Sequence, residues 1–471
     1  MTHHAGRIAL VALTLMTWGL PLACSDGGTS SGAKLSGPAD TVVADGEDPG
    51  PVDGGPADSG AQDAGPADGG PLDVAAADIV PDGVVLPKPA TVPDDLPPGV
   101  VATHLSSAPY DSVGKSENLQ IDLPKDTISL FAVMRGDHPG RFLLSKAVTM
   151  MGTVWMKGEC VELCTTCPNR VQAGPATGAA LIPSSTASLD AIKAMTWHLG
   201  SCGYSYVEKG GVYSKAPYKG KSVQTVMFSR TAPGGQVPAS GTIALRLFYT
   251  GGAGITAKTA VADPRVPAML AGATQILQTA GIKLVVDDVR DTGPGFQAVD
   301  EVNDLSLSGS SGLDTLFAEA GKYGGSAVLD VFIVGKIGKA DAPGGEVQGI
   351  SGGIPGPAFY HGIPRAGVAV ALGGFGEQEG ALAGRALARQ IGHFLGLWWT
   401  SDPNGGGHDP IDDTPECGKA NDGDGNGVVT ALECVGKGSD NAMFWQGTTP
   451  AATFSEQQGR ILRAHPLVFG P

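Results

Sequence analysis

Two segments of this chain carry side chains whose types and spacing could do chemistry. The first is a twelve-residue stretch from Asp422 to Glu433, with acids or an amide at positions 1, 3 and 5, glycine at position 6 and glutamate at position 12. Hard oxygen donors at these positions can wrap around a calcium ion, and the main-chain carbonyl at position 7 completes the set. The sequence therefore predicts a calcium site. Its expected ligands are Asp422, Asp424, Asn426, Glu433 and the carbonyl of Val428.

This spacing resembles the loop of an EF-hand, but the flanks differ from that motif. Pro415 and Gly418 precede the loop and disfavour an entering helix. Cys417 and Cys434 bracket the loop, and we expect them to form a disulfide. The prediction is a single stapled loop in which calcium has a structural role. The alternative is a solvated Asp/Gly turn that holds no ion.

The second segment covers residues 389–399 and contains one histidine, His393. Residues 391–397 resemble the core of the zinc-binding helix of metzincin metallopeptidases, which has the pattern His-Glu-x-x-His-x-x-Gly-x-x-His. Residues 408–415 are similar to the Asp-Thr-Pro segment of pappalysin-like metzincins. Residues 441–445 resemble the methionine turn of that family, and residues 454–460 resemble its final helix. Four features in the family's order imply a metzincin-like fold.

The resemblance also implies which chemistry is missing. The two outer zinc-ligand positions hold Arg389 and Trp399, and the position of the glutamate base holds Gln390. A guanidinium has no lone pair to offer a cation, and an amide cannot take a proton from water. We therefore expect no zinc and no peptide hydrolysis, with His393 as a vestigial ligand packed within its helix. We expect Met443 to be a core methionine beneath that helix.

Three functions remain open. The first is a catalytically inactive, protease-shaped protein that binds a peptide or protein. The second is an active, divergent zinc metalloendopeptidase in which His361, His408 or Asp409 joins His393 as a replacement ligand. The third is a structural envelope lipoprotein. Zinc content separates the first two functions, because catalytic zinc needs three placed ligands.

The N-terminus predicts export. Residues 1–24 contain Arg7, an apolar run and the sequence Leu-Ala-Cys ending at Cys24, as in a signal peptide. A small residue before that cysteine resembles the bacterial lipoprotein cleavage box, which implies lipidation of Cys24; ordinary secretion is the alternative. We expect a protein of the cell envelope or cell surface, in contact with a membrane through a lipid anchor.

Residues 25–100 predict a disordered tether. They are rich in Gly, Pro, Ala and Asp, and they contribute 14 acids and 2 lysines to a chain whose net charge is −16. Such a segment lacks the apolar residues needed for a core and stays extended through charge repulsion. The remaining chain is weakly acidic and shows no basic run, so we expect no nucleic-acid partner.

Two folded regions should follow the tether, giving an α+β protein. Residues 101–255 alternate short β-rich runs with turn residues and predict a β-sandwich accessory domain. Residues 256–471 predict a metzincin-like α/β domain in which helices and strands alternate. The expected strands are 128–133, 223–228 and 243–249 in the first region and 282–289, 327–334 and 367–372 in the second, and the expected helices are 264–280, 313–320 and 377–397.

Cysteine usage agrees with export. Apart from Cys24, six cysteines remain, and an even number suits three disulfides in an oxidising compartment. Cys160, Cys164, Cys167 and Cys202 could instead hold a structural zinc ion as four thiolates. Export favours disulfides, and the pairing of these four cysteines stays open.

Overall fold

A computed structural model describes residues 95–470, apart from short segments of which 157–168, 300–311, 339–346 and 374–378 are the longest. The signal peptide with Cys24, the tether up to residue 94, and Cys160, Cys164 and Cys167 lie outside the described residues. In chain order, the strands and helices are β1 (Val100–Leu105), β2 (Leu119–Asp122), β3 (Thr127–Gly136), β4 (Arg141–Thr149), β5 (Val154–Met156), β6 (Gly174–Pro175), β7 (Thr177–Ile182), β8 (Thr196–Lys209), β9 (Val212–Pro217), β10 (Val223–Thr231), β11 (Gly241–Tyr249), α1 (Arg265–Thr279), β12 (Ile282–Asp291), β13 (Ala298–Val299), α2 (Gly312–Ala318), β14 (Leu329–Val334), β15 (Lys336–Ile337), β16 (Gly349–Ser351), β17 (Val368–Ala371), α3 (Glu379–Phe394) and α4 (Glu456–Ala464).

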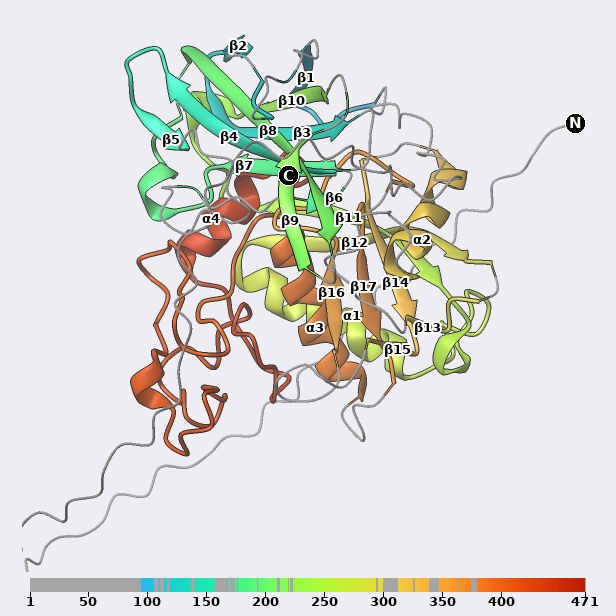
Figure 1. Ribbon diagram of the computed structural model, residues 1–471. Helices are drawn as coiled ribbons and strands as arrows, with labels where there is room; N and C mark the ends of the chain where they lie inside the picture. The colour runs from blue at the N-terminus through green and yellow to red at the C-terminus, as the bar shows by residue number, and fades with distance from the viewer. Residues whose placement is uncertain are drawn as a thin grey trace, which may run out of the picture. The chain divides into compact units, whose positions relative to one another are not determined.

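Two antiparallel sheets occupy the first part of the described chain (Figure 1). One has the strand order β1-β10-β3-β7, and the other has the order β2-β8-β4-β5, with β6 and β9 attached. Buried side chains from both sheets, including Met134 on β3 and Trp197 on β8, form a common apolar core. Two antiparallel sheets that share a core are the arrangement expected of a β-sandwich.

A five-stranded sheet with the order β12-β11-β14-β17-β16 follows. Its first four strands are parallel, and the short edge strand β16 is antiparallel to β17. Strand β11 corrects the sequence interpretation, which placed residues 243–249 in the sandwich. In the structure β11 pairs with β12 and β14. Ile243 to Tyr249 are all buried, and a continuous buried run is typical of a central parallel strand, not of an alternating sandwich strand.

Helices α1 and α3 pack against each other beside this sheet. The predicted apolar face of α1 is confirmed, since Val266, Met269, Ala273, Ile276 and Leu277 are buried. The helix ends before Gly281, whose φ of 71° suits glycine at a helix C-terminus. The α1–α3 contact is close because glycines face it: a Cβ on Gly384 would lie 2.6 Å from the main-chain oxygen of Met269.

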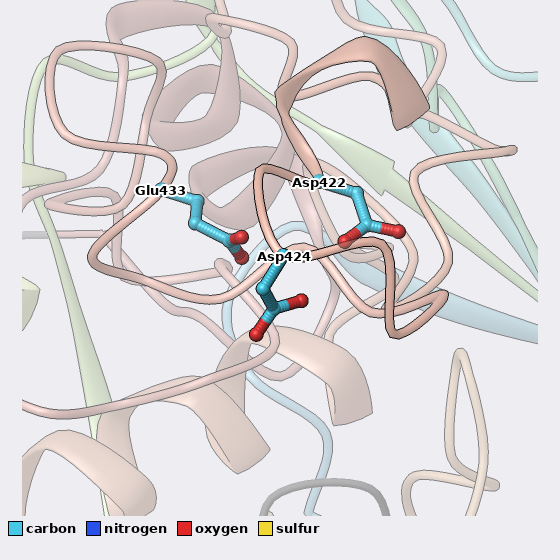
Figure 2. A group of neighbouring side chains, drawn as sticks. All are labelled: Asp422, Asp424 and Glu433. Carbon is cyan, nitrogen blue, oxygen red and sulfur yellow. The ribbon is translucent and has the colours of Figure 1, made fainter.

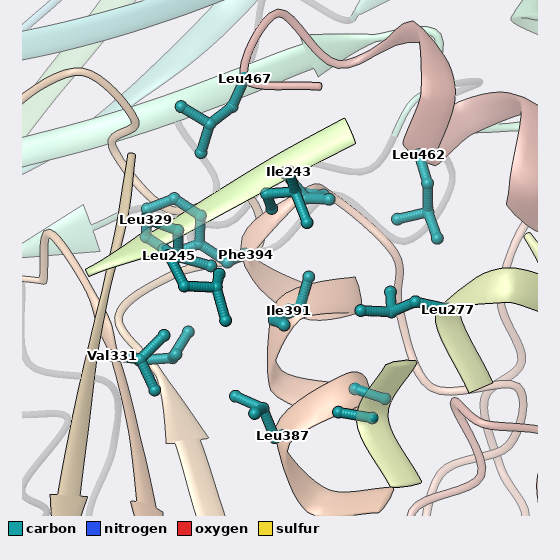
Figure 3. Close-up of a cluster of buried hydrophobic side chains, with 14 of the residues drawn as sticks. Ile243, Leu245, Leu277, Leu329, Val331, Leu387, Ile391, Phe394, Leu462 and Leu467 are labelled. Atoms are coloured by element: carbon teal, nitrogen blue, oxygen red, sulfur yellow. The ribbon is translucent and has the colours of Figure 1, made fainter. Parts of the chain in front are cut away.

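The main core joins α3 to the five-stranded sheet. Leu387, Ile391 and Phe394 of α3 point toward Ile243, Leu245, Leu329 and Val331 of strands β11 and β14 (Figure 3). Because apolar burial stabilises by about 25 cal/mol per Å², this face fixes the orientation of α3 and, with it, the directions in which Arg389 and His393 point.

The sheet that contains β3 is buried on both faces. Leu130 and Met134 face the sandwich core, whereas Phe131 and Val133 belong to the core shared with β11, α1 and α3. Side chains of a strand alternate between faces, so one strand serves two cores. The described residues from 95 onward accordingly group in one compact unit.

The other predicted elements lie close to their expected places. α2 continues as a 3₁₀ turn to Tyr323, and α3 is shorter than the expected helix 377–397 because it ends at Phe394, before Gly396. Strand β16, which lies in a Gly/Pro-rich stretch, is not among the strands expected from the sequence. No helix in the described part of the chain is both long and apolar enough to cross a membrane.

Candidate functional site

Arg389 lies on α3 at the position of the first zinc ligand in the resembled motif. The residue is only 6% exposed, and its guanidinium Nη1 donates hydrogen bonds to the main-chain oxygens of Trp445, at 2.6 Å, and Phe444, at 3.4 Å. Burial lowers the pKa of Arg389 to about 10, and the neighbouring Arg385 charge adds to this shift. The group remains cationic at neutral pH. A fixed positive charge therefore occupies the place where a zinc ion would need a ligand.

Arg385 lies one helical turn before Arg389 and makes a similar connection. Its guanidinium donates to the main-chain oxygens of Ser439, Asn441 and Thr449, at 2.9, 3.1 and 2.9 Å. Arg385 is not among the site residues predicted from the sequence. The signal was an arginine four residues before Arg389 on an otherwise apolar helix face, which places both guanidinium groups on one side. Together, the two arginines fasten α3 to residues 439–449.

His393 is a packed, neutral histidine. Its Nδ1 donates to the main-chain oxygen of Leu397 at 2.8 Å, because a carbonyl can only accept. Burial lowers its pKa to about 3; the Leu397 hydrogen bond opposes this shift, and the Arg389 charge adds to it. The ring of Trp399, at the third ligand position, meets the His393 ring edge-on with centroids 5.7 Å apart. An aromatic ring thus stands against His393 where a third histidine would be needed.

Met443 lies beneath α3, as predicted. A Cβ built on Gly392 would be 2.5 Å from the Met443 sulfur, so the glycine lets the methionine approach the helix backbone. Asn441 holds the turn by accepting the N–H of Met443 at 2.8 Å. Gln390, at the position of the glutamate base, is buried, and its Cγ packs close to Gly349 of β16.

The proposed replacement ligands have other partners. His361 Nδ1 lies 2.5 Å from an oxygen of the buried Asp330. His408 Nδ1 lies 3.2 Å from the hydroxyl of Ser401, and Asp409 accepts a hydrogen bond from Thr414. Within the described residues, the one group of three or more His, Cys, Asp or Glu side chains placed to share a metal ion does not include His393. The structure therefore does not assemble the rearranged zinc site.

That group is the predicted calcium triad, Asp422, Asp424 and Glu433 (Figure 2). One carboxylate oxygen from each lies within 4.8 Å of the others. Asn426 sits beside them, donating from its amide to Asp424 at 2.9 Å and accepting the Val428 N–H at 2.8 Å. Grouped carboxylate oxygens on a tight loop are compatible with calcium, a hard cation that prefers oxygen ligands.

The donors of this loop fit a cation in two further respects. The Oδ1 atom of Asp422 is buried and accepts no hydrogen bond from the described part of the chain. Main-chain N–H groups hold the other carboxylate oxygens in place, with Gly427 donating to Asp422 Oδ2 and Gly423 to Glu433 Oε1. Hydrogen bonds from the N–H and then the hydroxyl of Thr430 lower the pKa of Glu433, which keeps it ionised.

A disulfide links the residues that flank the loop, as predicted. Cys417 and Cys434 form a disulfide with Cα atoms 5.7 Å apart. A single 3₁₀ turn, Lys419–Asn421, precedes the loop, and turns rather than a helix follow it. Cys202 is buried and also disulfide-bonded, so in this structure it is not a thiolate ligand of zinc.

Two surface cavities lie away from these sites. One, of about 350 Å³, lies between residues 125–128, residues 234–237 and Arg460 of α4. The other, of about 460 Å³, is lined by residues 240–242, 281–283 and Gly470. Neither is lined by a residue of α3 or of the calcium loop.

Comparison with known proteins gives a weak structural likeness. No protein-family model matches the chain, and no curated protein matches its sequence. Among solved structures, the chain is similar to metalloproteinase-II from Bacteroides fragilis, with 12% sequence identity and a TM-score of 0.27 over 56% of this chain and 76% of that one. A TM-score this low does not establish a shared fold, so the functional proposals rest on the residues of this chain.

Proposed function

We propose that this chain is a metallopeptidase-like protein that has lost zinc chemistry and serves as a calcium-stabilised binding protein of the cell envelope. One observation carries the proposal: the buried Arg389 guanidinium stands at a zinc-ligand position and is engaged with the carbonyls of Phe444 and Trp445. Placing a metal ion beside it would bring two like charges together in a poorly solvated site, which costs several kcal/mol.

The lost ligands have structural replacements. Where a bound metal would tie the helix to the following turns, Arg385 and Arg389 make five hydrogen bonds to main-chain oxygens of residues 439–449. Hydrogen bonds from a charged donor contribute about 1.5–3 kcal/mol each, so this set can hold the architecture without zinc. Retention of the helix and turn is what a protein needs if its surface is used for binding.

Calcium supplies the second support. Asp422, Asp424 and Glu433 would hold the ion with their carboxylates, and Asn426 and the Val428 carbonyl would complete the shell. The ion's two positive charges would offset most of the three grouped negative charges and fix the segment between α3 and the methionine turn. The membrane anchor at Cys24, the tether 25–100, and a peptide or protein ligand belong to the same proposal and rest on the sequence.

Metal analysis of the full-length purified protein tests this function. We expect one calcium ion per chain, no stoichiometric zinc after equilibration with zinc and gel filtration, and no cleavage of a denatured protein substrate. One zinc ion per chain that is lost in His393→Ala would contradict the proposal and support an active metallopeptidase.

A restored variant provides the matched control. Arg389→His, Gln390→Glu and Trp399→His together rebuild the pattern that the resembled motif requires. Three nitrogen ligands on one helix and its following turn should then bind zinc. Zinc uptake by the triple variant, but not by the native chain, would show that the scaffold persists and that the substitutions removed the metal.

A structural envelope role is the second candidate, and the Trp399 ring against His393 favours it. The two candidates differ in ligand binding. A binding protein should select peptides from a displayed random library, and Trp399→Ala should change that selection. A purely structural protein should select none in either form.

A further inference from the structure

We infer that Trp445 is a positioning residue through which calcium bound to residues 422–433 orders helix α3. This inference rests on the proposed calcium site and adds a physical connection from that loop to the former zinc position. The connection runs from Val429 through Trp445 to Arg389. Each step is a hydrogen bond or a chain connection between described residues.

The first step lies in two adjacent peptide groups. Val428 provides the carbonyl expected on the calcium ion, and Val429 is the next residue. The Val429 N–H donates to the oxygen of Pro403 at 2.8 Å, and the Val429 oxygen accepts from the indole Nε1 of Trp445, also at 2.8 Å. The Val428 carbonyl and the Val429 N–H belong to one planar peptide group, and the Val429 carbonyl belongs to the next. A displacement of the Val428 carbonyl therefore also moves the oxygen that accepts the hydrogen bond from Trp445.

The second step is Trp445 itself. Its indole N–H faces the calcium loop, and its main-chain oxygen accepts the 2.6 Å hydrogen bond from Arg389 of α3. Trp445 therefore bonds to the calcium loop through its side chain and to α3 through its main chain. A buried charged donor such as Arg389 is sensitive to displacement of its acceptor, because losing the partner leaves the charge without compensation.

Additional contacts keep the loop and the turn moving together. The side chain of Gln446 accepts the N–H of Ala431 at 2.7 Å. Cys417, Cys434, Val429, Ala431 and Phe444 form a small apolar core of their own, with Trp445 packed against it. This core joins the disulfide, the calcium loop and the turn that contacts α3, so the loop cannot shift without moving the turn.

The third step reaches the helix backbone. Met443, two residues before Trp445, contacts α3 at Gly392, where the absence of a Cβ leaves room for the methionine side chain. Displacement of the 443–446 turn would therefore change both the Arg389 hydrogen bonds and the Met443 contact. Both changes fall in the C-terminal half of α3, next to His393.

Calcium binding determines whether the loop at the start of this connection is ordered. Without the ion, three carboxylates whose oxygens lie within 4.8 Å repel one another, and main-chain N–H groups compensate only in part. With the ion, attraction replaces repulsion and the loop is fixed. The ordered loop then holds Trp445, and Trp445 holds the acceptor of Arg389.

Hydrogen exchange measured by mass spectrometry tests the connection in the full-length protein. In the native chain, calcium should slow exchange at least tenfold in peptides covering the loop and in peptides covering residues 385–397. Trp445→Phe keeps an aromatic ring at this position and removes the indole N–H together with part of the bicyclic ring; Trp399→Phe makes the same loss of ring atoms. In Trp445→Phe calcium should still protect the loop, while its effect on residues 385–397 falls several-fold.

Trp399→Phe is the matched control, because the Trp399 ring contacts His393 of α3 and is not part of the connection from Val429 through Trp445 to Arg389. It should retain the calcium effect on both regions. Equal protection of residues 385–397 in the native chain and Trp445→Phe would overturn the inference. If titration calorimetry shows no calcium binding to the native chain, the proposed calcium site itself fails, which is a separate outcome.

Discussion

Acid should destabilise this protein through His393, and the structure gives the size of the effect. Burial lowers the His393 pKa from 6.5 to about 3, and the same is true of His465. Because the folded-state pKa is depressed, the unfolded chain takes up a proton below pH 6.5 while the folded chain does not. Stability contributed by the neutral histidine is therefore complete above pH 6.5 and is lost as the pH falls from 6.5 toward 3.

The magnitude follows from proton linkage. Each bound proton changes the free energy of unfolding by about 1.4 kcal/mol per pH unit, so between roughly pH 7.5 and pH 5 one such histidine removes about 2 kcal/mol. Carboxylates add their own dependence, but a variant that differs only at His393 cancels that background. His393→Asn is suitable, since an amide can still donate to the Leu397 oxygen and does not titrate.

Urea denaturation at both pH values, with disulfides intact and EDTA present, measures the effect. Native protein should lose about 2 kcal/mol more than His393→Asn on moving from roughly pH 7.5 to pH 5. EDTA removes the pH dependence of calcium binding from the comparison. Parallel losses in the two proteins would refute the conclusion that His393 is buried and neutral, and would be expected if it were accessible to solvent.

Three further predictions concern packing and the calcium loop. Gly384→Ala should lower the free energy of unfolding by about 1–2 kcal/mol in urea melts, because its Cβ would overpack the backbone of α1. Gly272→Ala is the control: its Cβ would have its nearest neighbour 3.4 Å away, and it should raise the free energy of unfolding by up to about 1 kcal/mol. Replacing Cys417 and Cys434 with serine should cost about 3 kcal/mol, since the disulfide closes a 17-residue separation; no change in the urea midpoint would contradict this. Calcium should raise the melting temperature of the native protein but not of Glu433→Gln, and an equal rise in both would reject the ligand assignment.

The sequence determined the local chemistry well. The spacing from Asp422 to Glu433 was sufficient to predict which acids would meet, because loop ligands lie within a few residues of one another. The same holds for the Cys417–Cys434 disulfide and for the apolar face of α1. Local patterns of this kind depend on short chain segments, whose geometry is narrowly restricted.

Strand partnership could not be read from the sequence in the same way. Residues 243–249 suit a strand in either a sandwich or a parallel sheet, and their partners, β12 and β14, lie later in the chain. Only pairing across the whole chain decided that β11 is central to the α/β sheet. The same long-range packing buried β3 on both faces.

Residues 389–399 show the division most clearly. The types of Arg389, Gln390 and Trp399 were enough to predict that zinc chemistry is lost, since ligand and base capacity belong to the side chains themselves. What Arg389 does instead was decided by tertiary structure, which brings the carbonyls of Phe444 and Trp445, 55 and 56 residues away, to its guanidinium. A sequence pattern names the groups that a helix presents; the partners that satisfy a buried charge come from distant segments and are fixed only when the chain has folded.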